Sequence, residues 1–97
     1  MLEKQTIIDK IEIASNGAIA FRLGLLIIED GEVLARNWHR SGVEPGGDVD
    51  AQFALVNTHL VSMGKRAVPA AEISRLKDIS AVVWTPAVIA VHRAKAA

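Results

Sequence analysis

One stretch, residues 18–40 (AIAFRLGLLIIEDGEVLARNWHR), limits the possible folds of this chain more than any other. Two largely apolar runs flank Asp30-Gly31, and a two-residue type I′ turn needs positive φ at both central positions, which Asp-Gly tolerates. The stretch therefore predicts two antiparallel strands, residues 18–29 and 32–40, joined by a tight turn. The segment before it is expected to add a strand, and the segment after it to supply covering helices.

The first predicted strand covers residues 6–14 (TIIDKIEIA). Ile11 and Ile13 alternate with charged residues there, which is the period of a half-buried strand. A two-residue turn at Asn16-Gly17 would place both isoleucines on the face opposite Phe21. A bulge at Gly17 would reverse that assignment, because a shift of one residue moves every side chain to the other face.

A two-residue turn at Asp30-Gly31 also fixes the expected pairing of the second and third strands. Ile27 would then face Leu34, and Leu23 would face Trp38. Both faces of such a sheet are apolar, so either the helices cover both faces or another subunit covers one. The first face would carry Phe21, Leu23, Leu25, Ile27, Leu34 and Trp38, and the second Leu26, Ile28, Val33 and Ala35.

Helix signals follow a loop at residues 41–47 (SGVEPGG). Asp48 is a good N-cap for a helix over residues 49–63, Pro69 opens a second helix, and Thr85-Pro86 opens a third over residues 87–95. The sequence therefore predicts an α+β domain, residues 1–97. An N-terminal three-stranded antiparallel meander (1–40) is followed by a loop (41–47) and by two or three helices (48–97).

No residue pattern predicts catalysis, a cofactor or a metal. The chain has no cysteine, which excludes disulfides, thiolate zinc sites and a cysteine nucleophile. His39, His59 and His92 lack the spacing of metal ligands, and no serine lies in a nucleophile-elbow motif. The expectation is a protein that is not an enzyme, with no catalytic, cofactor-binding or metal-binding residues.

The net charge and the hydropathy of the chain limit the classes of partner that it is expected to bind. Eleven basic and eleven acidic residues give zero net charge, which argues against a dedicated nucleic-acid binder. Arg36, Trp38 and Arg40 are the exception, because basic residues around an aromatic ring can bind single-stranded nucleic acid; the alternative is that Trp38 packs in the sheet. The longest apolar run, residues 81–91, is shorter than the roughly 20 residues of a membrane span, so no membrane partner is expected.

Three blocks of the sequence stand out together: IDKIEI at 8–13, RLGLLIIEDGEVLARNWHRSGVEPGGDV at 22–49 and VWTPAVIAVHRA at 83–94. In these blocks the chain resembles a family of small tailed-bacteriophage proteins encoded among tail and tail-fibre genes. It departs from the family in residues 49–82, which are longer and more helical, and at Ala87, where an acidic residue is common. The resemblance implies no catalytic residue. It implies a role in the virion, or in the host cytoplasm during assembly.

The expected function is therefore that of a non-enzymatic phage structural or assembly protein. It would act by self-association, or by docking an apolar sheet face on a tail component. The alternative is a small regulatory module that binds nucleic acid or a host protein. The predicted partner surface consists of Phe21, Leu23, Leu25, Leu34 and Trp38, with Arg36 and Arg40 at its rim.

Overall fold

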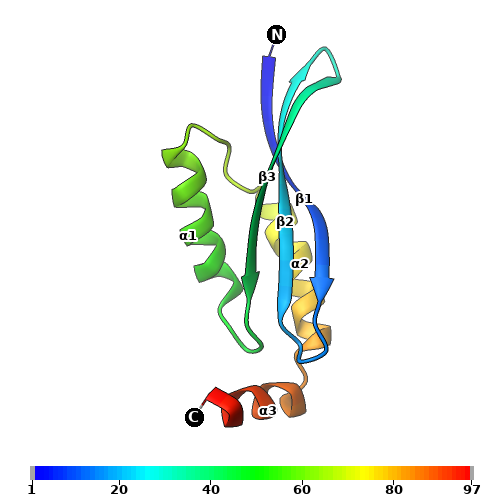
Figure 1. Cartoon of the computed structure of the whole chain (residues 1–97), viewed down its shortest axis with the longest axis vertical. Helices are drawn as coiled ribbons and strands as arrows, with labels where there is room; N and C mark the ends of the chain where they lie inside the picture. Colours follow the sequence, from blue (N-terminus) through cyan, green and yellow to red (C-terminus); the bar gives the residue numbers. More distant parts are fainter. Residues whose placement is uncertain (1, 97) are drawn as a thin grey trace.

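The structure, a computed structural model, describes residues 2–96 and has three strands followed by three helices (Figure 1). The strands form one antiparallel sheet in the order β1-β2-β3, which confirms the predicted α+β meander followed by helices. The elements are β1 (Leu2–Ile13), β2 (Ile19–Glu29), β3 (Glu32–Val43), α1 (Val49–Ser62), α2 (Ala70–Val83) and α3 (Pro86–Ala96).

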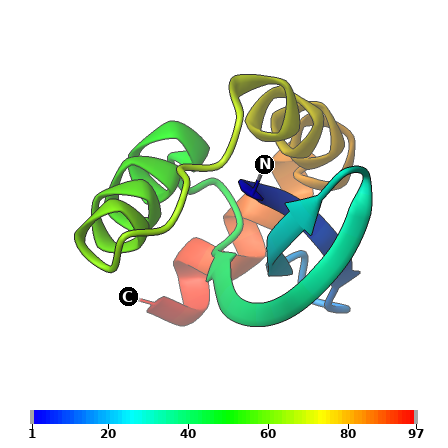
Figure 2. The same cartoon turned by 90° about the horizontal axis from the view of Figure 1, so that it is seen from above.

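The molecule is elongated, with principal extents of 51 × 23 × 18 Å. Helices α1 and α2 both lie on one side of the sheet, and α3 crosses the end at which β3 finishes (Figures 1 and 2). At the other end, the strands and the β2–β3 turn extend past the helices (Figure 1). The sheet therefore has one covered face, one uncovered face and one projecting end.

The core lies between the covered face and the two helices. Phe21 of β2 stacks on Phe53 of α1, with ring centroids 4.8 Å apart and an interplanar angle of 19°. Burial of such aliphatic and aromatic side chains contributes about 25 cal/mol per Å² of apolar surface. The side chains with almost no exposed area are Ile19, Leu23, Phe53, Leu60 and Leu76.

The pairing of β2 with β3 differs from the prediction. The turn itself is as expected, with φ of 51° at Asp30 and 82° at Gly31. After two regular pairs, Glu29–Glu32 and Ile28–Val33, a β-bulge shifts the register, so that Ile27 pairs with Ala35 and Leu23 pairs with His39. The predicted Ile27–Leu34 and Leu23–Trp38 pairs are therefore wrong.

The bulge has a packing consequence. Trp38 pairs with Gly24 and so lies on the uncovered face rather than beside Leu23. A Cβ placed on Gly24 would lie only 3.4 Å from Cζ3 of the Trp38 ring. The missing side chain at Gly24 therefore gives the indole room to lie close to the strand.

The turn between β1 and β2 also differs from the two-residue version. The amide of Ala14 donates to the carbonyl of Ala18 at 2.9 Å, which leaves a three-residue turn with Gly17 at φ 93°. Ile11 consequently pairs with Phe21 and packs against the core. Ile11 therefore lies on the same face as Phe21, which is the arrangement that the sequence predicted for a bulge at Gly17.

The starts of α1 and α3 agree with the sequence prediction, whereas the end of β3 does not. Asp48 caps α1 as predicted, because its Oδ1 accepts a hydrogen bond from the amide of Ala51 at 3.0 Å. Thr85 caps α3 in the same way, accepting from Val88 at 3.3 Å. Residues 41–43, however, were expected in a loop and belong to β3, since Val43 pairs with Ile19. The backbone pairing of residues 41–43 with the start of β2 outweighs the loop-like composition of that segment.

Candidate functional site

The seven residues of the predicted partner surface do not share one face. Phe21, Leu23 and Leu25 lie in the core beneath the chain's own helices, with 3%, 0% and 7% of their surface exposed. The expectation that they line an exposed surface is therefore wrong, because α1 and α2 cover this face of the sheet; the register shift separates them from Trp38, which lies on the other face. The other four, Leu34, Arg36, Trp38 and Arg40, are exposed.

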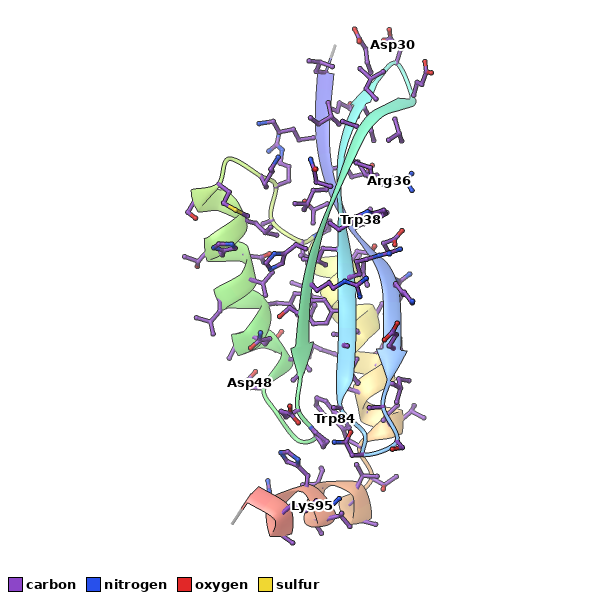
Figure 3. The ribbon with its side chains drawn as sticks, viewed as in Figure 1. Asp30, Arg36, Trp38, Asp48, Trp84 and Lys95 are labelled. Carbon is purple, nitrogen blue, oxygen red and sulfur yellow. The ribbon has the colours of Figure 1, made fainter. Side chains whose placement is uncertain are left out.

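Three of these four residues lie on the uncovered face. Trp38 is 45% exposed. The guanidinium carbon of Arg22 lies 4.1 Å from the centroid of its ring, and that of Arg36 lies at 5.6 Å. Arg40 of β3 pairs with Arg22 of β2. Figure 3 shows Arg36 and Trp38 one after the other along β3. We call this surface the Trp38 face; it comprises Asp9, Lys10, Glu12, Arg22, Arg36, Trp38 and Arg40.

Carboxylates neutralise part of this surface. Asp9 accepts hydrogen bonds from Nε of Arg22 at 2.9 Å and from its Nη2, so the guanidinium is held over the indole. Lys10 contacts Glu12 at 2.8 Å, and its hydrogen bond and charge hold the pKa of that carboxyl below its usual range. These contacts neutralise Arg22 and Lys10, two of the four cations on the face.

Arg36 and Arg40 are the remaining two cations. Within the part of the chain that the structure describes, no carboxylate lies within ion-pair distance of either guanidinium. Both side chains are exposed beside Trp38. The Trp38 face thus presents an aromatic ring with two available positive charges, an arrangement suited to a carboxylate or a phosphate with an apolar neighbour.

Leu34 belongs to a different surface. We call residues 2–3 and 27–35, the ends of the strands beyond the helices, the strand arm (Figure 1). Leu2, Val33 and Leu34 are 62%, 41% and 53% exposed there, and two further isoleucines are half-buried. Its acidic side chains include Glu3, Glu29 and Glu32, all exposed. The arm is therefore aliphatic and acidic, whereas the Trp38 face is aromatic and basic.

The free edge of β1 is closed by α2. The backbone amide of Ile8 donates to Oε1 of Glu72 at 3.2 Å, and its carbonyl accepts from Nη2 of Arg75 at 3.3 Å. The two helix side chains are themselves 3.5 Å apart as an ion pair. An exposed sheet edge is a template for pairing with another strand, so this contact blocks strand addition at the middle of β1.

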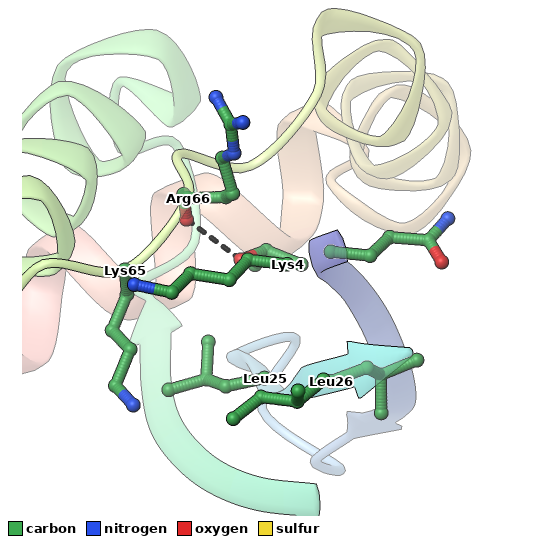
Figure 4. A pocket seen from close by; sticks show the side chains of 8 residues that line it. Lys4, Leu25, Leu26, Lys65 and Arg66 are labelled. Atoms are coloured by element: carbon green, nitrogen blue, oxygen red, sulfur yellow. Dashed lines mark hydrogen bonds between the residues drawn. The ribbon is translucent and has the colours of Figure 1, made fainter. Parts of the chain in front are cut away.

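Two wide hollows, of about 440 Å³ beside Ile19 and Val43 and of about 860 Å³ between Glu3 and Lys65, are open to solvent. The cavity under the loop after α1 has a volume of about 10 Å³ and lies where Thr6 donates to the carbonyl of Arg66 at 2.6 Å (Figure 4). That volume holds about one water molecule. Among residues 2–96, no three His, Asp or Glu side chains gather as a metal site would require. No helix in the described region has the length and apolar character needed to cross a membrane.

The sequence predicted neither Asp9, Lys10 and Glu12 of the Trp38 face nor the cation nearest the ring, Arg22. Arg22 lies between two core residues of β2, and that alternation would have placed it on the uncovered face. No protein-family model, curated protein sequence or solved structure matches this chain.

Proposed function

We propose that this chain is a non-enzymatic structural or assembly protein of a tailed-phage particle that docks through its strand arm. The supporting observation is the arm itself, which carries aliphatic side chains that none of the three helices covers. Such a concentration of exposed apolar surface marks interaction sites in folded proteins.

The physical driving force is burial of the arm. Leu2, Val33 and Leu34 are the most exposed aliphatic residues of the arm, and they lie near the end of an elongated molecule. Each Å² of apolar surface removed from water contributes about 25 cal/mol, before the cost of association is subtracted. A projecting end reaches a partner without rearrangement of the core. The resemblance to small phage tail-region proteins suggests the setting, a tail component or another copy.

A direct test follows the chain during phage assembly. Particles and tail intermediates from the phage that encodes it would be purified by density gradient and probed with an antibody. We expect the wild-type chain to co-purify with tails or tail intermediates, and Leu34→Ser to reduce that fraction several-fold. A chain that stays entirely outside these fractions would contradict the proposal. Arg93→Gln on α3 is the matched surface control.

A second candidate function is supported by the Trp38 face. An exposed indole beside Arg36 and Arg40 could stack on a base while the guanidinium groups contact phosphates. The test is quenching of tryptophan fluorescence by an oligothymidylate across a salt series. Salt-dependent binding that is lost in Arg36→Ala/Arg40→Ala would favour a small nucleic-acid-binding module over the assembly role.

A further inference from the structure

We propose that the strand arm of one copy docks on the Trp38 face of the next copy, head to tail. This inference rests on the proposed function, because it names the partner of the docking arm as a second copy of the same chain. Two complementary properties of the surfaces support it: their charge and their shape.

Charge is separated along the molecule. The arm carries the exposed carboxylates Glu3, Glu29 and Glu32. On the Trp38 face, no carboxylate among residues 2–96 lies within ion-pair distance of Arg36 or Arg40, although the charge of Arg40 contributes to lowering the pKa of Glu12. The net charge of the whole chain is nevertheless zero. The acidic end of one copy therefore matches the basic surface of another, which steers association and fixes its orientation.

Shape is complementary as well. Gly24 lies across from Trp38 on the uncovered face, and the small pair Ala20 and Gly42 lies four residues further along the strands. A depression of about 50 Å³ opens beside Ala20, between Arg22 and Arg40. The arm presents the branched aliphatic side chains of Val33 and Leu34. An aliphatic side chain from one copy can enter the depression and pack against Ala20 and the aliphatic stems of Arg22 and Arg40 of the other.

The topology requires two copies for this contact. The arm and the Trp38 face are successive parts of the same three strands, and β2 runs through both without interruption. The arm of a copy therefore cannot fold back on its own Trp38 face. In a head-to-tail assembly each pair of copies shares one such contact, so the contact is heterologous and builds an open chain or a closed ring; two arms docked reciprocally would instead close a two-fold dimer.

Charge also favours a protein partner over nucleic acid. Asp9 and Glu12 already neutralise half of the cations on the Trp38 face. A nucleic acid strand carries a negative charge at every nucleotide and would approach these carboxylates along its length. The few separate glutamates of the arm need only the two available arginines.

The test uses two variants that each lose one half of the interface. Glu29→Gln/Glu32→Gln/Leu34→Ser changes only the arm, and Arg36→Gln/Arg40→Gln changes only the Trp38 face. All five positions are exposed, so the fold is expected to survive, which circular dichroism would verify. Arg93→Gln/Lys95→Gln on α3 is the matched control. Light scattering after size exclusion reports the mass of each protein and of an equimolar mixture.

We expect wild type and control to form assemblies larger than a dimer, and each half-interface variant to remain at the 10.4 kDa of one chain. The mixture retains one intact arm and one intact face, so it should give a capped dimer of twice that mass. A mixture that stays monomeric, or single variants that assemble like wild type, would overturn the inference. So would a monomeric wild type that binds an oligothymidylate through Arg36 and Arg40.

These outcomes differ from those that would refute the proposed function. A wild-type chain that is monomeric in solution yet present in purified tails would overturn head-to-tail docking and leave the assembly role standing, with a tail component as the partner. A chain that assembles in solution but is absent from tails and tail intermediates would support head-to-tail docking and overturn the proposed role in tail assembly.

Discussion

The indole Nε1 of Trp84 donates a hydrogen bond of 2.6 Å to the carbonyl oxygen of Gly17. The contact joins the residue before α3 to the turn between β1 and β2, 67 positions away in the sequence. Gly17 also lies against α3, because a Cβ at this position would be 2.5 Å from Cγ1 of Val88. This turn is therefore the docking point of the last helix.

The first prediction concerns that turn. Gly17→Ala should destabilise the fold by more than Gly31→Ala, although both glycines have positive φ, 93° and 82°. At Gly31 nothing lies within 4 Å of an added Cβ, so only the backbone strain of about 1–2 kcal/mol applies. At Gly17 the clash with Val88 adds to that strain. Urea denaturation of the two variants measures the difference, and equal losses would show that α3 does not pack on the turn.

The second prediction concerns the edge of β1. Glu72→Ala removes the acceptor for the amide of Ile8 and should cost about 1 kcal/mol of stability. It should also raise the rate of aggregation, because the strand edge becomes open to pairing. Glu72→Gln keeps an oxygen acceptor and is the control. Thermal unfolding and thioflavin fluorescence would check both effects; identical behaviour of the two variants would argue against edge capping.

The third prediction separates core from arm. Leu23→Ala should cost about 2–5 kcal/mol, because the side chain is fully buried between the sheet and its helices. Leu34→Ala removes the same atoms from an exposed position and should change the free energy of unfolding by less than about 0.5 kcal/mol. Guanidinium denaturation at low protein concentration measures both. A large loss in Leu34→Ala would mean that the arm packs within its own chain.

The fourth prediction concerns the contact between α1 and α2. Nζ of Lys77 lies 2.7 Å from a carboxylate oxygen of Asp50, and this hydrogen bond and charge raise the pKa of Lys77. A raised pKa in the folded state stabilises the fold at pH values below the unfolded pKa, and that contribution is lost as pH rises through the folded value. The small stability gap between wild type and Asp50→Asn should therefore close in strongly alkaline solution. A gap that persists above that range would argue against the pair.

The sequence predicted the order and type of the elements because local signals specify them. Asp30-Gly31 forms the expected turn, and Asp48 forms the expected N-cap. The bulge after the turn has no such local signal. It depends on packing across the sheet, since only the shifted register places the Trp38 ring over Gly24.

The candidate site was predicted only in part, because local sequence signals specify some of its features and packing across the sheet specifies the others. Arg36, Trp38 and Arg40 have the same spacing in any register of β3, so their grouping was visible in the sequence. Their position on the uncovered face, with Arg22 stacked on the indole, depends on the bulge. The assignment of Phe21 and Leu23 to the same surface failed because α1 and α2 cover that side of the sheet.

The most direct measurement of the central claim, that the uncovered arm docks, is the solution mass of the chain over a hundredfold range of concentration. Wild type and Val33→Ser/Leu34→Ser would be compared by light scattering behind size exclusion. We predict that the wild-type mass rises with concentration above the 10.4 kDa of one chain, while the variant remains at that mass. A variant that associates as strongly as wild type would contradict it, because the uncovered aliphatic residues of the arm would then play no part in docking.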